Sequence, residues 1–279
     1  MAPVPSPAGE AAPDAGTRNA PVIVLTYGNA GGNRLQALLE SQPELTCTVG
    51  TGILPACEQA ATAWKQAELR PARPLSPMAL KSIRAMTGQM ITIVTVRTGR
   101  PRWCELATAE PSAAAVFGEI FPEARFLCLH RSCPDLISAV LLASPWGLSG
   151  PGYAPYVTAY PGSTVAALAA WWTARARPLL DFEKRHPGQC QRLHYADLDQ
   201  DPDATVDRIR AFLGLGGPAA LPGEPSAAPD RAPARPNGPA GPGLAVELPV
   251  DQIPPPLLAQ VSDLHTALGY PPLGPGGTG

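Results

Sequence analysis

The segment TYGNAGGNRL, residues 26–35, places three glycines between an apolar run and a helical pattern. A glycine-rich turn at the start of a helix lets main-chain N–H groups point into one concavity, where the unpaired donors and the helix dipole favour an anion. The segment lacks the Gly-Lys-Ser/Thr ending of a nucleoside triphosphate loop, which argues against a kinase or an ATPase. It therefore predicts an anion site, with a tight turn that uses glycine for its geometry alone as the alternative.

Arg131 directly follows a second apolar run, ARFLCLH at residues 124–130. Open α/β sheets bind ligands at the carboxyl ends of their strands, so this guanidinium is placed to hold a phosphate through two hydrogen bonds. The alternative is a surface arginine that pairs with Asp135, four residues further along a helix. His130 alternates to the opposite side of the strand and is expected to be packed.

Strand and helix patterns alternate around these two features. Short apolar runs predict buried parallel strands at residues 21–28, 124–130 and 191–198. Apolar residues at helical spacing predict helices at residues 33–40, 134–142, 164–183, 205–213 and 253–268. Such alternation predicts a three-layer α/β domain with a central, mostly parallel sheet, and Trp171 and Trp172 on the longest helix are expected in its core.

Composition divides the chain into four parts. Residues 1–20 are rich in Ala, Pro and Gly and are expected to be a disordered leader, whereas residues 21–216 carry nearly all the aromatic residues and form the α/β domain. Residues 217–249 are expected to be a linker or loop, because proline recurs every third or fourth position through most of them. Residues 250–279 restore a helical pattern and are expected to pack on the same domain as a C-terminal helix and tail.

The composition also argues against several classes of protein. The 279 residues are 45% hydrophobic and carry a net charge of −2, so the chain has a core but no basic field for a nucleic acid or an anionic membrane. The six cysteines form no C-x-x-C pair and the four histidines have no metal-ligand spacing, which predicts reduced thiols and no metal. Neither a signal peptide nor a spanning segment is found, so we expect a cytoplasmic protein.

Three further segments complete a pattern: RWCELA at residues 102–107, FPEARFLCLHR at 121–131 and SPWGLSGPG at 144–152. With RLHYADLDQDPDATVDRIRAFLGL at 192–215 and the C-terminal IPPPLL and LGYPPL, the chain resembles the sulfotransferases that use 3′-phosphoadenosine 5′-phosphosulfate (PAPS), in particular a bacterial small-molecule group. The resemblance implies a P-loop-like sulfotransferase fold over roughly residues 21–216 and 250–273. It implies PAPS as co-substrate without a metal, and a small-molecule acceptor, and it leaves a protein partner or a homodimer open.

The resemblance assigns a donor site to residues of this chain. The turn would hold the 5′-phosphosulfate, through Gly28, Asn29, Ala30, Gly31, Gly32, Asn33 and Arg34. Arg131 would face the 3′-phosphate, with Ser138 as the nearest hydroxyl on the following helix. Arg34 would also support catalysis by turning toward the anion, with a solvent-facing arginine as the alternative.

The remaining candidates concern catalysis and the acceptor. In RWCELA, Glu105 lies where the family motif W-C-D-K-S has its aspartate, and it is the candidate general base. The alternative is an ion pair to Arg102 or Arg131. Trp146, Tyr153 and Tyr156 lie in a Gly/Pro/aromatic loop; they would line an acceptor pocket, or pack this loop against the core.

The chain departs from the family pattern at positions expected to touch the donor. Asn29 replaces a basic residue and Leu106 a lysine, while Gly50 and Ala139 replace an expected glutamate and an expected serine. Each charge-assisted hydrogen bond contributes about 1.5–3 kcal/mol, so these losses predict weaker donor binding. Two functions follow. One is sulfuryl transfer to a hydroxyl or amine of a small molecule in specialised metabolite biosynthesis; the other is a sulfotransferase-fold protein that has lost transfer and acts as a non-catalytic partner or a repurposed small-molecule enzyme.

Overall fold

The computed structural model describes residues 20–69, 74–107, 111–143, 148, 152–216 and 250–273. The expected leader apart from Ala20, the expected linker at 217–249 and the candidate acceptor residue Trp146 lie outside these residues. Among the helices described, none combines the length and hydropathy that crossing a bilayer requires.

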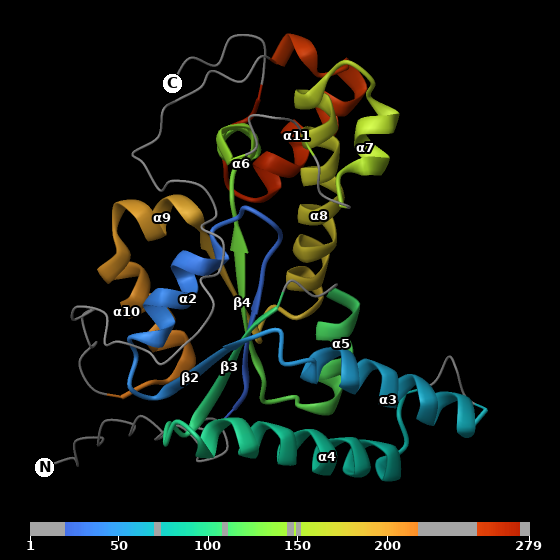
Figure 1. The fold of residues 1–279 in the computed structure, drawn as a ribbon, viewed down its shortest axis with the longest axis vertical. Coiled ribbons are helices and arrows are strands. Elements are labelled where there is room, and N and C mark those ends of the chain that lie inside the picture. The colour runs from blue at the N-terminus through green and yellow to red at the C-terminus, as the bar shows by residue number, and fades with distance from the viewer. Residues whose placement is uncertain are drawn as a thin grey trace, which may run out of the picture.

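Five parallel strands form the centre of the described domain, in the order β2-β3-β1-β4-β5 (Figure 1). Their bounds are β1 Val22–Leu25, β2 Leu45–Val49, β3 Arg102–Ala107, β4 Arg125–His130 and β5 Cys190–His194. The predicted parallel sheet is confirmed, and the three predicted strands are β1, β4 and β5. The apolar patterns do not predict β2 and β3, because polar residues such as Thr46 and Glu105 interrupt them.

The last strand ends earlier than the sequence predicts. β5 stops at His194, and the residues expected to continue it to position 198 form helix α9, Tyr195–Gln200. Asp197 lies in the first turn of α9, where the helix dipole favours an acidic side chain, and Leu198 is buried. Tyr195 therefore lies at the carboxyl edge of the sheet, at the point where β5 turns into α9.

Helices cover both faces of the sheet, so the predicted three layers are confirmed (Figure 1). Along β1, Val22 and Val24 pack in one apolar cluster while Ile23 and Leu25 pack in the other. Helices α2 (Gly32–Glu40), α9 and α10 (Pro202–Leu213) cover the first face. The second cluster includes residues of α3 (Ile53–Ala67), α4 (Pro77–Val96), α5 (Pro111–Ile120), α6 (Cys133–Ala143), α8 (Thr164–Arg185) and α11 (Pro255–Ala267), with the short α7 (Ala154–Ala159) packed against it.

The register of the sheet brings three separate segments to one edge. Leu25, at the end of β1, is paired with Ala107 of β3 on one side and with Cys128 of β4 on the other. All three strands run in the same direction, so their carboxyl ends meet at this edge. The turn after β1, the end of β3 and Arg131 after β4 are thereby placed next to one another.

A buried ionic cluster joins α8 to β4 and β5 near the same edge. Glu183 is 7% exposed; its Oε1 lies 2.7 Å from Nε2 of His130, and its Oε2 accepts a hydrogen bond from Nε of Arg192 at 2.7 Å. Burial lowers the pKa of His130, so the ring is neutral and donates through Nε2–H. Burial alone would raise the pKa of Glu183, but the hydrogen bond from His130 and the charge of Arg192 hold it below its ordinary value.

Replacing Glu183 by glutamine is expected to lower the free energy of unfolding by about 2–3 kcal/mol, because Arg192, about a third exposed, loses its anionic partner. Urea unfolding measures this loss. Glu123→Gln is the matched control: Glu123 pairs with Arg84 at the surface, with side-chain exposures of 39% and 45%, and such pairs contribute at most about 1 kcal/mol. Equal losses in the two variants would contradict a structural role for the buried cluster.

The free energy of unfolding is expected to fall as the pH drops from about 7.5 to about 5.5. Burial lowers the pKa of His130 and of His265, so the folded chain leaves both rings neutral. The unfolded chain binds these protons near pH 6.5, at the ordinary histidine pKa, and acidification therefore favours unfolding. His130→Gln keeps a donor toward Glu183, so urea unfolding at the two pH values should show a smaller fall for this variant. A fall as large as that of the parent would exclude His130 as a source.

Candidate functional site

The glycine-rich turn leads from β1 into α2 through two residues in the left-handed region. Asn29 has φ 62° and Gly31 has φ 99°; asparagine tolerates this region better than most residues. The N–H of Ala30 donates to the carbonyl oxygen of Tyr27 at 3.1 Å, and Gly31 precedes α2 without a capping side chain. Arg34 N–H already donates to the carbonyl oxygen of Gly31 at 3.0 Å, so the N–H groups of Gly32 and Asn33 are the ones at the start of α2 without a helical acceptor, as an anion site requires.

The structure brings Arg131 to this turn. Its Nη1 donates to the carbonyl oxygen of Asn29 at 3.0 Å, although the two residues are 102 positions apart. Asp135, the alternative partner considered from the sequence, instead accepts a hydrogen bond from Oγ of Ser132 at 2.5 Å. A guanidinium and the N-terminus of α2 thus lie together at the carboxyl edge of the sheet.

Two buried aromatic side chains fix the main chain of Arg131. Nε1 of Trp172 donates to the carbonyl oxygen of Arg131 at 3.0 Å, and the N–H of Arg131 donates to Oη of Tyr27 at 3.2 Å. Burial raises the pKa of Tyr27 far above its ordinary value, so its hydroxyl stays protonated and also donates to the Arg131 carbonyl, at 3.3 Å. The core, and not the surface, therefore sets the position of Arg131.

Tyr195 covers the turn from the other side. A Cβ built on Gly31 would lie 2.1 Å from Cδ2 of Tyr195, so only glycine fits at position 31. The guanidinium of Arg131 lies over the same ring, 4.1 Å from its centroid, which is within cation–π range. Sequence reasoning did not single out Tyr195, because its contact with the turn arises only when α9 follows β5.

Apolar packing closes the base of the turn. Gly32 is buried, and a Cβ at this position would meet Cγ2 of Thr26 at 3.2 Å and Cδ1 of Leu106 at 3.3 Å. Leu106 is 7% exposed and belongs to the cluster beneath α2. The position at which the family pattern has a lysine thus directly adjoins the turn, and in this chain it carries a hydrocarbon side chain.

The other residues assigned to the donor site are less closely grouped. Arg34 is tied to α9: its Nη2 lies 3.1 Å from Oδ1 of Asp199, and its Nε donates to the carbonyl oxygen of Leu198 at 3.2 Å. Asn33 is exposed on α2, and Ser138 is half-buried on α6. Gly28 is exposed and Ala30 fully buried within the turn itself.

Glu105, the candidate general base, is held by the segment that connects β2 to α3. Its Oε1 accepts hydrogen bonds from the N–H of Thr51 at 2.8 Å and from the hydroxyl of Thr51 at 3.1 Å, and its Oε2 accepts one from the hydroxyl of Thr48. The side chain is 3% exposed. Arg102, one of the partners considered from the sequence, instead donates to the carbonyl oxygens of Ala20 and Leu213. Glu105 thus anchors this connection.

Tyr153 reaches the turn, whereas Tyr156 packs on the core cluster from α7. Oη of Tyr153 accepts a hydrogen bond from Nδ2 of Asn29 at 3.1 Å, and its ring lies 5.0 Å from that of Trp171. Burial raises the pKa of Tyr153, so the phenol is neutral. Tyr156 is half-buried against the same apolar cluster.

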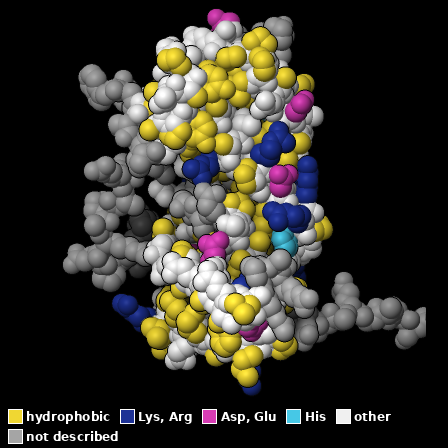
Figure 2. All heavy atoms as spheres, turned by 90° about the vertical axis from the view of Figure 1, so that its right-hand side faces the viewer, with side chains coloured by type: hydrophobic (Ala, Val, Ile, Leu, Met, Phe, Trp, Pro, Cys, Tyr) yellow, Lys and Arg dark blue, Asp and Glu magenta, His cyan; other side chains and the backbone are white. Residues whose placement is uncertain are grey.

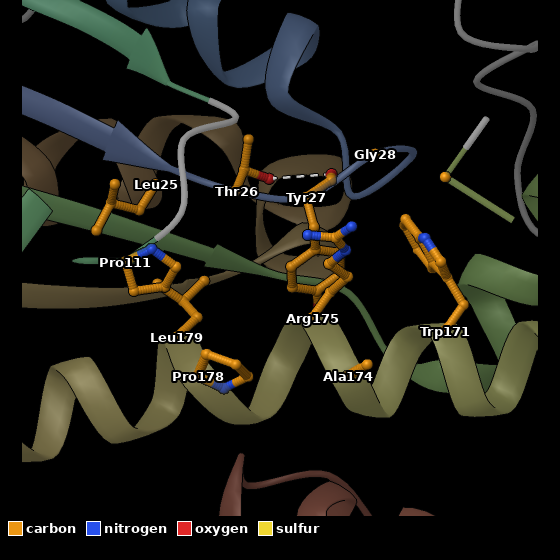
Figure 3. A pocket seen from close by; sticks show the side chains of 11 residues that line it. Leu25, Thr26, Tyr27, Gly28, Pro111, Trp171, Ala174, Arg175, Pro178 and Leu179 are labelled. Carbon is orange, nitrogen blue, oxygen red and sulfur yellow. Dashed lines mark hydrogen bonds between the residues drawn. The ribbon is translucent and has the colours of Figure 1, made fainter. Parts of the chain in front are cut away.

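A hollow of about 370 Å³ opens beside Gly28, between the end of β1 and helix α8 (Figure 3). The strand side contributes Leu25, Thr26, Tyr27 and Gly28; α8 contributes Trp171, Ala174, Arg175, Pro178 and Leu179, and Pro111 and Gly152 complete the lining. In Figure 3 the side chains of α8 rise toward the end of β1. Figure 2, which views the molecule from the side of α8, shows cationic, anionic and apolar side chains interspersed on this face.

Comparisons with known proteins agree on one family. The model of the sulfotransferase family matches residues 21–217, well over half of the chain. A curated relative, Protein-tyrosine sulfotransferase A of Caenorhabditis elegans, is 21% identical over 214 residues, which are 72% of this chain and 52% of that protein; the chain thus spans about half the length of this relative.

Two solved structures are similar in fold. The sulfotransferase domain from the curacin biosynthetic pathway aligns with a TM-score of 0.54 at 13% identity, over 91% of this chain and 99% of that domain. The sulfotransferase domain from the Synechococcus PCC 7002 olefin synthase aligns with a TM-score of 0.45 at 15% identity, over 72% and 76% of the two chains. With the family match over residues 21–217, the parallel sheet and the turn joined to Arg131, the chain belongs to the sulfotransferase family.

Proposed function

We propose that the chain transfers a sulfuryl group from PAPS to a hydroxyl or amine of a small molecule. The observation that carries the proposal is the contact between Arg131 and the turn, with Nη1 at 3.0 Å from the carbonyl oxygen of Asn29. This contact puts a cation next to the turn that leads into α2, an arrangement that supports binding of a nucleotide with two separated anionic groups. The hollow beside Gly28 would hold the acceptor next to the donor.

The reaction needs little covalent chemistry from the protein. The acceptor oxygen forms a bond to sulfur as the bond from sulfur to the phosphate oxygen breaks, the bisphosphate nucleotide leaves, and the acceptor proton passes to a base. The N–H groups at the start of α2 and the guanidinium of Arg131 would stabilise the charge on the transferred group and on the leaving nucleotide. Glu105 and Arg34 remain the catalytic candidates. To act as a base, Glu105 would have to release one of its hydrogen bonds from Thr48 and Thr51. To reach the anion, Arg34 would have to release its contact with Asp199.

The cell compartment and pathway are part of the same proposal. The similar solved domain from the curacin pathway is named for a biosynthetic route, which supports placing this chain in the biosynthesis of a specialised metabolite. All six cysteines are free in the structure, which supports a reducing, cytoplasmic location as part of the proposal.

A second function is favoured by the base of the turn. Leu106 packs where the family pattern has a lysine, and Arg34 is held by Asp199 on α9. Both observations suit a protein that keeps the fold and has lost transfer, acting as a non-catalytic partner or on a different small molecule. Binding of the donor nucleotide separates the two functions.

Calorimetric titration with 3′-phosphoadenosine 5′-phosphate is expected to show binding that depends on Arg131. Arg131→Ala removes a charge-assisted contact worth about 1.5–3 kcal/mol and should weaken affinity about 10- to 100-fold. Arg125→Ala is the matched control, because Arg125 begins the same strand at its opposite end, where it donates to the carbonyl oxygen of Gly188. No heat from the parent at millimolar nucleotide, or equal weakening in both variants, would contradict the proposed transferase.

Leu106→Lys tests the second function. If Leu106 has closed the site, a lysine beside the turn should strengthen binding of the same nucleotide about tenfold or more, because it adds a charge-assisted contact. Leu106→Met, which keeps an apolar chain of similar volume, should leave binding unchanged. A parent that already binds as tightly as the lysine variant would exclude loss of the donor site, provided that thermal unfolding shows both variants to be folded.

A further inference from the structure

Proline lies inside the helix that forms one wall of the hollow. Pro178 occurs within α8, Thr164–Arg185, and lines the hollow together with Ala174, four residues earlier. Proline has no N–H, so the carbonyl group of Ala174 lacks the hydrogen bond that residue i+4 gives in a regular helix. Ala174 and Pro178 are both exposed, and both lie on the helix face that borders the hollow.

The other described residues of the lining are mainly apolar, and no carboxylate is among them. Leu25, Trp171 and Leu179 are each at most 5% exposed and form its deeper part, while Gly28 at the turn is exposed. Arg175 is the one charged residue among the described lining, and its side chain points toward Tyr27 in Figure 3. Among the described lining a cationic ligand would find no carboxylate, whereas a neutral ligand with an apolar body would displace water from the apolar walls.

From this lining we infer that the hollow takes a neutral, largely apolar alcohol that carries a second hydrogen-bond donor, and that the carbonyl of Ala174 accepts from this donor. The inference rests on the proposed function, because the first hydroxyl would lie at Gly28, next to the donor nucleotide. It narrows the acceptor from a hydroxyl or amine to an uncharged diol-like molecule. Trp171, Ala174 and Pro178 thereby become specificity residues on α8, separate from the loop residues that the sequence suggested.

The test compares two ligands on two proteins. The probes are 1,6-hexanediol and 1-hexanol, titrated by ligand-detected NMR with and without saturating 3′-phosphoadenosine 5′-phosphate. The variant Pro178→Ala restores an N–H that pairs with the carbonyl of Ala174. If the diol loses one neutral hydrogen bond in this variant, its dissociation constant should rise about fivefold relative to that of 1-hexanol.

The same variant separates a structural role from a binding role. Replacing a proline inside a helix by alanine is expected to raise the melting temperature, so weaker diol binding would occur in a more stable protein.

Two further arms test the shape and charge of the hollow. Ala174→Phe should abolish binding of both probes. Arg177→Phe, at an exposed position of α8 that does not line the hollow, should leave their binding intact. The third probe, 6-amino-1-hexanol, is a cation at neutral pH and should bind more weakly than the diol.

The outcomes show separately whether the inference fails and whether the proposed function fails. An unchanged ratio for Pro178→Ala, equal effects of Ala174→Phe and Arg177→Phe, or tighter binding of the amino alcohol would overturn the inference. If the nucleotide binds and the inference fails, the proposed donor site stands. If the nucleotide does not bind but the diol follows the expected pattern without it, the proposed transferase fails while the hollow remains a binding site for an apolar alcohol, as a repurposed protein would have.

Discussion

The hydrogen bond from Arg131 to the carbonyl oxygen of Asn29 joins the segments that follow two neighbouring parallel strands. It forms because β1 and β4 run side by side in register, so the residues that follow them emerge at the same edge. Tyr27 and Trp172 hold the main chain of Arg131 from within the core, and Tyr195 supports its guanidinium. The position of this cation is therefore set before any ligand is present, which is the preorganisation that the proposed binding of an anion would use.

Helix α8 links this site to the stability of the domain. Within 13 residues it supplies Trp171 to the hollow, Trp172 to the Arg131 carbonyl and Glu183 to the buried cluster with His130 and Arg192. Pro178 lies between Trp172 and Glu183 along this helix, and because proline has no N–H, the carbonyl of Ala174 lacks its usual i+4 hydrogen bond. A single long helix can therefore hold the main chain of Arg131 at the carboxyl edge of the sheet and line the hollow beside Gly28 at the same time.

The base of the turn is apolar in this chain, although the family pattern has a lysine at position 106. A Cβ at Gly32 would lie 3.2 Å from Cγ2 of Thr26 and 3.3 Å from Cδ1 of Leu106, so a side chain here would require these neighbours to shift slightly. A side chain at position 32 would press on Leu106, so the two positions are coupled by packing. Arg34 and Glu105 are likewise held by partners of their own, in Asp199 and in the two threonines Thr48 and Thr51. The cost of using either in catalysis is the loss of those contacts.

The sequence by itself determined the fold class, three of the strands, the helices at 33–40 and 164–183, and the family. These features rest on local periodicity and on glycine, proline and arginine at fixed places along one stretch of chain. Only the tertiary structure decided that Tyr195 begins a helix and covers Gly31, that Arg34 binds Asp199, and that Pro178 borders a hollow beside Gly28. Those contacts join residues far apart in the chain. Which of these residues come into contact depends on how the strands pair and how the helices pack, and neither can be inferred from the spacing of residues within one segment.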